Sequence, residues 1–373
     1  MNSKIYFDNN STTALDPRVF KAMLADLQGP PANPSSVHSF GRAAKKLLDE
    51  ARKELAAFFG ARETDVTFTS GGTESMNLLL RGIGAGHIIT TDIEHSSTYN
   101  TVQALSANGL KATFLKIGLE GAPSVTQVEN AISTDTCAIV LSAVNGETGV
   151  KLDIHAMAAM ATRRKIPLFL DAVAWVGKEP IEWPHGVAGM TVSAHKFHGP
   201  KGVGALILRP GVKLSPQITG GPQEFSRRAG TENLSGILGL SAALRIVKET
   251  QTEITQHLTD LCRHFECQLL RALPNVAVNG LGPRVANVVN LAFLGCDGET
   301  LLLHLDMQGI AASHGSACAS GALEPSRVLL NMGLERKVAR SSIRFSFGRF
   351  NTREEVDIAL EKIVGIVRAL ADR

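Results

Sequence analysis

Three short stretches of the sequence carry residue types that can bind and hold a charged ligand. The first is TFTSGGTESMNLLL, residues 67–80, in which an apolar strand pattern meets a glycine pair and then a helix opened by Thr73 and Glu74. Backbone N–H groups at a helix amino terminus, with Gly72 and the Thr73 hydroxyl beside them, form a cradle for phosphate. An ordinary glycine turn with a threonine cap would carry the same letters.

A carboxylate and an amine follow at the ends of two later strand patterns. Asp171, in FLDAV, ends a strand of buried composition, where an acid costs desolvation unless it meets a cation such as a protonated ring nitrogen. Lys196, in TVSAHKFHGPKG, precedes a Gly-Pro turn that would hold its amine over the carboxyl edge of a sheet, where ligands of open α/β sheets bind. Ser193 and His195 would face a phosphate there. A strand-end aspartate capping a turn and a surface lysine are the plainer interpretations of each residue alone.

Together the three stretches describe a single ligand. It has a phosphate for the helix terminus, a carbonyl that a lysine amine can bind covalently, and a ring nitrogen that a carboxylate keeps protonated. These are the demands of pyridoxal 5'-phosphate.

The elements that position these residues follow an α/β pattern. Between residue 65 and about 209, seven short apolar runs alternate with helical patterns: DVTFTS, HIITTD, ATFLKI, CAIVLSAV, PLFLDAV, GMTVSA and VGALILR. Such near-continuous apolar strands predict a mainly parallel, seven-stranded sheet covered by helices on both faces.

Helical patterns surround this sheet. DPRVFKAMLADLQ has an Asp cap and Pro17 at its first helical position, SFGRAAKKLLDEARKELAAFFG ends at a glycine, and residues 233–272 form a long helical region. Later segments alternate strand and helix, and Thr352 and Glu355 have capping-box spacing. We expect a large ligand-binding domain at residues 15–260 and a small α+β domain made of residues 1–14 and 261–373.

The composition excludes several classes of protein. At 373 residues and 44% hydrophobic, the chain can bury a sizeable core. Its net charge of +3, with dispersed Lys and Arg, argues against nucleic acid or an anionic membrane as principal partner, because binding either needs clustered positive charge. No apolar run approaches the ~18 residues that a membrane span needs.

The cysteines indicate a reducing compartment. Cys137, Cys262, Cys267, Cys296 and Cys318 form no CxxC pair and are odd in number, so we expect neither a disulfide framework nor a metal site. The polar amino terminus MNSKIYFDNNSTTALDP has no signal-peptide pattern. We therefore expect a cytoplasmic protein.

Ten motifs in register resemble the cysteine desulfurases of the NifS/IscS type, which have the class V aminotransferase fold of pyridoxal phosphate enzymes. The likeness spans almost the whole chain, and so many motifs in order are highly specific. The motifs are FDNNSTTALDPRV, NPSSVHSFGR, TSGGTES, EHSS, NGETGV, LDAV, SAHKFHGPKG, RRAGTEN, SHGSACAS and SSIRFSFGRF.

The resemblance implies an enzyme that removes sulfur from L-cysteine, leaving L-alanine and an enzyme-bound persulfide. Lys196 corresponds to the lysine that binds the cofactor covalently and moves protons at the substrate Cα. Asp171 corresponds to the acid that keeps the pyridine nitrogen protonated. His95, in EHSS, corresponds to a histidine that stacks on the cofactor ring, the alternative being a strand-end histidine with no ligand.

The resemblance also assigns the phosphate contacts. Gly72, Thr73, Ser193 and His195 match residues that bind the cofactor phosphate within one subunit. Thr231, in RRAGTEN, matches a residue that reaches the phosphate across a dimer interface. The resemblance therefore implies a homodimer.

The substrate contacts come from the last part of the chain. Arg344, in SSIRFS, matches the arginine whose planar fork binds the substrate carboxylate, and it fits the motif better than Arg349. Cys318 matches the nucleophile that attacks the substrate sulfur, on a loop that carries the persulfide to an acceptor. A buried, inert thiol is the commoner fate of a free cysteine. His314 either assists the Cys318 thiolate or is a solvated loop residue, which we favour.

The sequence departs from the family at two places in the site. Gly146, in VNGETG, replaces an Asn that lies by the cofactor and the substrate carboxylate, and Ala174, in DAVAW, replaces a Gln that donates to the cofactor phenolic oxygen. Both lost groups are hydrogen-bond donors. We therefore expect weaker cysteine affinity or slower turnover than is usual in the family.

Three functions remain open at this stage. The first is a cysteine desulfurase that passes sulfur to an iron–sulfur scaffold protein or a carrier for tRNA thiolation, by analogy with relatives that have similar loops. The second is another class V enzyme such as a selenocysteine lyase. The third is a poorly active paralogue that acts as a binding platform for sulfur-transfer partners.

Overall fold

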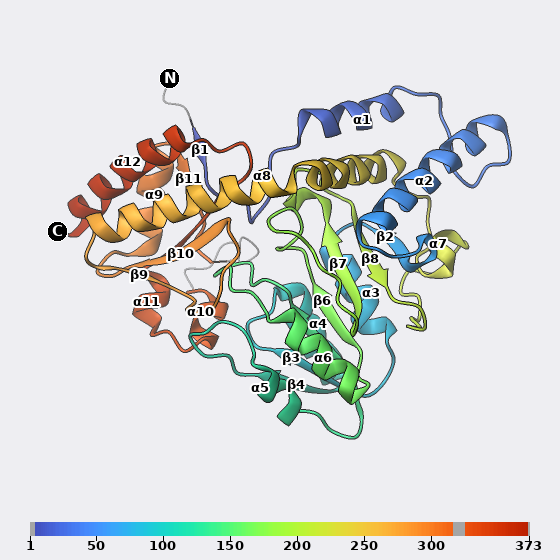
Figure 1. The fold of residues 1–373 in the computed structure, drawn as a ribbon, viewed down its shortest axis with the longest axis horizontal. Helices are drawn as coiled ribbons and strands as arrows, with labels where there is room; N and C mark the ends of the chain where they lie inside the picture. The colour runs from blue at the N-terminus through green and yellow to red at the C-terminus, as the bar shows by residue number, and fades with distance from the viewer. Residues whose placement is uncertain (1–3, 316–324, 372–373) are drawn as a thin grey trace.

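The computed structural model describes residues 4–315 and 325–371, which form two lobes connected by one long helix, α8 (Leu234–Ala272). The large lobe contains a central sheet, and the small lobe contains both the carboxyl-terminal segment and the amino-terminal strand (Figure 1). No helix in the described residues is long and apolar enough to cross a membrane.

The large lobe has a seven-stranded sheet in which six strands run parallel, as expected. Only β8 is antiparallel to its neighbours β2 and β7. In spatial order the strands are β2 (Val66–Thr69), β8 (Gly204–Leu208), β7 (Val187–Ser193), β6 (Leu168–Asp171), β5 (Thr136–Ser142), β3 (His87–Thr91) and β4 (Lys111–Leu115).

Helices cover both faces of this sheet because successive strand residues point to opposite sides. In β5, Ile139 and Leu141 pack into one core, and Ala138 and Val140 pack into the other. The first core also receives α2 (Ser39–Phe58), α6 (Ile154–Arg164) and the first half of α8. The second core receives α3 (Gly72–Gly82) and α4 (Ser96–Ala107).

The helix ends in the large lobe follow their sequence signals. Helix α1 (Pro17–Leu27) begins with Pro17, and the Asp16 carboxylate caps it by accepting from the Arg18 N–H at 2.7 Å.

The remaining short helical elements are η1 (Glu63–Asp65), α5 (Val125–Asn130), η2 (Ala194–Lys196) and α7 (Gln223–Ser226).

The small lobe is an α+β unit. Its antiparallel sheet has the order β12 (Ser342–Ser346), β10 (Val288–Phe293) and β9 (Val276–Val278), and β1 (Ile5–Tyr6) pairs in parallel with β11 (Ile310–Ala311). Helices α9 (Gly298–Met307) and α12 (Arg353–Ala371) pack into its core, whereas α10 (Arg327–Asn331) and α11 (Arg336–Arg340) contribute to a separate apolar cluster with Ile93 and Ile117. The capping box at α12 is confirmed, since the Glu355 N–H donates to the Thr352 hydroxyl at 3.2 Å and the Thr352 N–H donates to the Glu355 carboxylate at 3.0 Å.

Helix α8 belongs to both lobes. Its residues up to Val247 pack into the core of the large lobe, and those from Ile254 onward pack into the core of the small lobe. The domain boundary at residue 260 therefore falls within a continuous helix, and it stays a prediction.

Candidate active site

A cavity of about 280 Å³ lies where the parallel strands β5, β6 and β7 end. Their last residues, Ser142, Asp171 and Ser193, all line it, because the carboxyl ends of parallel strands share one edge of a sheet. Eight of the ten site residues expected from the sequence also line this cavity: Gly72, Thr73, His95, Asp171, Ser193, His195, Lys196 and Arg344.

The amino terminus of α3 forms one wall of the cavity. The helix begins at Gly72, one residue before the expected start, and Gly71 precedes it with φ of 154°, a backbone conformation that favours glycine. A Cβ at Gly72 would lie 2.7 Å from Cγ2 of Val173, so a side chain would close this corner. The first N–H groups of α3 have no partners within the helix, and they lie beside Thr73 and Ser193 at an opening suited to an anion.

Asp171 presents a carboxylate from the end of β6. Its Oδ1 accepts from the Val173 N–H at 3.0 Å and from the Thr191 hydroxyl at 3.4 Å. Within the described residues, these bonds leave Oδ2 of Asp171 for a donor in the cavity. A protonated ring nitrogen is a donor of the right charge.

Glu94 is a second carboxyl group beside the cavity, and the sequence reasoning did not select it. It accepts from the Thr91 hydroxyl at 2.8 Å and from the Ser142 hydroxyl. Burial, reinforced by the negative charge of Asp171, raises the pKa of Glu94 to about 7. Near neutral pH Glu94 is therefore partly protonated.

Lys196 enters the cavity from η2, the short turn after β7. Its amine donates to the backbone carbonyl of Ser11 at 2.8 Å and to that of Asn10. The amino-terminal segment thus passes beside the amine, a contact that nothing in the local sequence indicated.

His95 caps α4 and has a defined ring orientation. Its Nδ1 accepts from the Ser97 N–H at 3.1 Å and lies 2.7 Å from the Ser97 hydroxyl. Because Nδ1 is the acceptor, a neutral imidazole at this position carries its proton on Nε2.

His195 is a neutral donor or acceptor near neutral pH. Burial, followed by the positive charges of Lys196 and Lys201, lowers the pKa of His195 to about 4. Its Nδ1 lies 3.1 Å from the Thr12 hydroxyl. A neutral imidazole at a phosphate site contributes a hydrogen bond and no charge.

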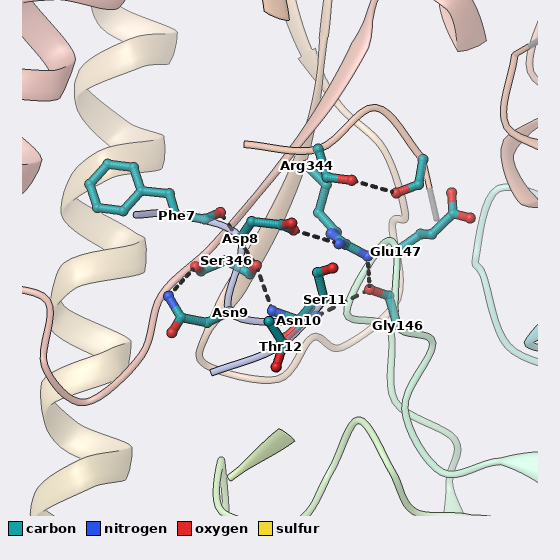
Figure 2. A network of polar contacts seen from close by, with 12 residues as sticks. Phe7, Asp8, Asn9, Asn10, Ser11, Thr12, Gly146, Glu147, Arg344 and Ser346 are labelled. Carbon is teal, nitrogen blue, oxygen red and sulfur yellow. Dashed lines mark hydrogen bonds and ion pairs between the residues drawn. The ribbon is translucent and has the colours of Figure 1, made fainter. Parts of the chain in front are cut away.

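Arg344 also lines the cavity and already has partners (Figure 2). Its Nη2 pairs with the Asp8 carboxylate at 2.8 Å, and its Nη1 donates to the Gly146 carbonyl at 3.1 Å. These contacts fix the guanidinium plane at the cavity wall. The rival Arg349 pairs instead with Asp16 and does not line the cavity.

The two departures from the family pattern are neighbours in space. A Cβ built on Gly146 would lie 4.0 Å from the Ala174 Cβ, with no closer side chain or backbone atom. Both positions line the cavity. The two missing donors would therefore have shared one patch of the wall.

Of the two remaining expected site residues, the structure describes only one. Thr231 is exposed in the loop between α7 and α8 and does not line the cavity of its own chain. Cys318 lies outside the described residues. His314, close to it in sequence, is half-buried and donates from Nε2 to the Arg340 carbonyl at 2.8 Å, so its ring is engaged and not freely solvated.

The structure adds Arg327 to the cavity wall. Its guanidinium donates to the backbone carbonyls of Asp92 and Glu94 and lies 4.0 Å from the ring centroid of Tyr99. Arg327 therefore stabilises the turn that leads into His95. The sequence motif EPSRV gave no reason to select it, because all three contacts come from a distant segment.

Comparison with known proteins agrees with this geometry. The family described as aminotransferase class-V matches residues 5–359. The chain is 39% identical to a cysteine desulfurase IscS of Clostridium botulinum (strain Hall), over 99% of this chain and 95% of the relative. The chain belongs to the class-V aminotransferase family.

Solved structures of the family have the same fold. A NifS-like protein superposes with a TM-score of 0.91 at 31% identity, covering 98% of this chain and all of that chain. A structure described as SspA in complex with cysteine superposes with a TM-score of 0.81 at 28% identity, covering 94% of this chain and 100% of that chain.

Within the described residues of this family member, no cluster of His, Cys, Asp and Glu could hold a metal ion.

Proposed function

We propose that this protein is a pyridoxal 5'-phosphate-dependent cysteine desulfurase. The observation that carries the proposal is the single cavity of about 280 Å³ that gathers a helix amino terminus, a strand-end carboxylate and a lysine amine. The named cysteine desulfurases among its full-length relatives support the same activity.

The residues present fit the cofactor. The glycine at the start of α3 leaves room where a Cβ would meet Val173, and N–H groups and hydroxyls surround that opening, as a phosphate requires. Oδ2 of Asp171 would pair with the pyridine nitrogen, and the Lys196 amine would form the covalent link. When bound, the cofactor supplies an electron sink for the substrate.

The chain's own residues then hold and move protons. In the proposal the Asp171 carboxylate pairs with the protonated ring nitrogen of the cofactor. The Ser97 contacts to Nδ1 of His95 fix the orientation of the imidazole and so of its Nε2–H. The Lys196 amine takes and returns the Cα proton of L-cysteine. Arg344, fixed by Asp8, binds the substrate carboxylate.

The sulfur leaves through Cys318. Its thiolate attacks the sulfur of L-cysteine, the substrate Cβ–S bond breaks, and a new S–S bond makes the persulfide. The electron pair left on Cβ takes up a proton, and L-alanine is released. The reaction thus converts L-cysteine and a thiol into L-alanine and a persulfide without an added oxidant.

The proposal includes a homodimer and a sulfur acceptor. Exposure of Thr231 outside its own cavity supports a contact with the phosphate site of a second subunit. The acceptor is a protein that receives persulfide sulfur for iron–sulfur cluster assembly or tRNA thiolation. We propose that the enzyme works in the reducing cytoplasm.

An activity assay with matched variants tests the proposal. The purified protein should be yellow, and adding L-cysteine with a thiol reductant should release alanine and sulfide. Cys318→Ala should abolish sulfide release and keep the colour, whereas the control Cys267→Ala, at an exposed position on α8, should change neither. A yellow wild type that makes no alanine would contradict the activity and favour a binding platform.

A further inference from the structure

Lys178 has a buried amine that contacts the backbone of the proposed active-site lysine, Lys196. It lies in the turn that follows β6 and is 2% exposed. Its Nζ donates to the backbone carbonyl of Lys196 at 2.9 Å. In the described part of the chain no carboxylate pairs with this amine, which is unusual for a buried cation.

The surroundings of Lys178 are predominantly basic. The charged and titratable groups that face it are Lys196 on η2, His198 just after η2 and Arg349 after β12. Asp16, the one acid of this cluster, is already paired with Arg349 and Arg18. Helix α8 contributes an uncharged group, the Thr255 hydroxyl, which donates to the Lys178 carbonyl at 3.0 Å.

Electrostatics in this cluster oppose any additional positive charge. Burial, followed by the charges of Lys196 and Arg349, lowers the pKa of Lys178 to about 7. Lys178 and Lys196 act on each other in this way, because two nearby cations each disfavour protonation of the other. The cluster also lowers the pKa of His198 to about 3, with burial as the largest cause.

We propose that Lys178 is a positioning residue that holds the Lys196 backbone and, when it is protonated, favours the unprotonated form of the Lys196 nitrogen through its positive charge. This inference rests on the proposed function, in which that nitrogen must accept the Cα proton. A neighbouring cation is an established way to keep a lysine nitrogen neutral and reactive. The bond to the Lys196 carbonyl places the charge at a fixed position relative to the reacting side chain.

Three variants of the cofactor-loaded enzyme separate the charge from the hydrogen bond. Lys178→Met removes both, Lys178→Gln removes the charge and keeps a donor, and Lys178→Arg keeps the charge. The readout is the visible absorbance of the bound cofactor between pH 5 and 10, which reports protonation of the nitrogen that joins it to Lys196. Thermal unfolding of each variant identifies any that fail to fold.

We expect Met and Gln to raise the pKa in this titration by about one unit, the size typical of partly screened like charges in neighbouring side chains. Arg stays charged over this whole pH range, so it should leave the pKa at or below the wild-type value. The acid limb of the kcat profile should move in the same direction as the absorbance.

Two outcomes distinguish this inference from the function on which it rests. If the wild type is yellow and folded Met and Gln variants titrate at the wild-type pH, Lys178 does not tune Lys196 and the inference is wrong, while the desulfurase remains. If the wild type binds no cofactor, the proposed function fails first and the inference fails with it. If Lys178→Gln and Lys178→Arg shift the pKa of the absorbance titration equally, the charge of Lys178 does not act on Lys196 and the inference is also wrong.

Discussion

Restoring the two missing donors in the cavity wall should improve turnover of L-cysteine. The perturbation is Gly146→Asn, Ala174→Gln and the two together. Gly146 has no left-handed φ, and among the described residues an added Cβ would meet only the Ala174 Cβ at 4.0 Å, so the backbone position accepts a Cβ. The Gly146 carbonyl, which holds Arg344 and Asn10, is a backbone group and stays in place.

The magnitude follows from the hydrogen bonds regained. A hydrogen bond to a charged group contributes about 1.5 to 3 kcal/mol, which corresponds to a gain of roughly 10- to 100-fold in kcat/KM for each productive donor. Because the two positions are in contact range, their effects should be non-additive in the double variant.

The assay is alanine release over a range of L-cysteine concentrations, with kcat and KM determined separately. Gly146→Leu and Ala174→Met are the matched controls, since they fill similar space without a donor. We expect the controls to stay at or below wild-type kcat/KM. No gain from either donor variant, or equal gains from the controls, would refute the reasoning that the departures weaken the enzyme.

Three further predictions concern buried charges. Because the pKa of Glu94 is raised, the folded protein holds a proton that the unfolded chain has lost between about pH 4.5 and 7, so wild-type stability should fall by about 3 kcal/mol as pH rises through that window. Denaturant unfolding of the apo protein should show that the free energy of unfolding falls with pH in the wild type and not in Glu94→Gln. The same pH dependence in both proteins would count against this prediction. Glu224→Gln should lower the free energy of unfolding by about 3 kcal/mol, since it leaves Arg52 buried without its 2.6 Å partner, and a loss below about 1 kcal/mol would be inconsistent with that pair. Asp171→Asn should weaken cofactor retention at least about tenfold on dialysis, measured by absorbance, and unchanged retention would argue against its role opposite the ring nitrogen.

Much of the fold was predictable because its causes are local. The seven apolar runs became the seven strands, since a parallel sheet covered on both faces needs nearly continuous apolar segments. Asp16 and Pro17 at the start of α1, and Thr352 with Glu355 at α12, satisfy orphan N–H groups within a few residues. Such contacts depend on sequence neighbours alone.

Part of the site was also predictable from the sequence. Asp171 and Lys196 follow separate apolar strands, and strand ends of one parallel sheet must meet at the same edge. Their convergence in one cavity follows from topology. The roles of Thr231 and Cys318 remain predictions from the family resemblance.

The tertiary structure alone decided the electrostatic environment of the site. Nothing in GKEP or EHSS distinguishes Lys178 or Glu94 from an ordinary polar residue, but both are buried beside other charges. The contact of Lys196 with Asn10 and Ser11 joins segments about 185 residues apart. Desolvation and Coulomb interactions depend on distances in space, which no local spacing encodes. The sequence thus determined which reactive groups the protein has, and the fold determined how strongly each one holds its proton.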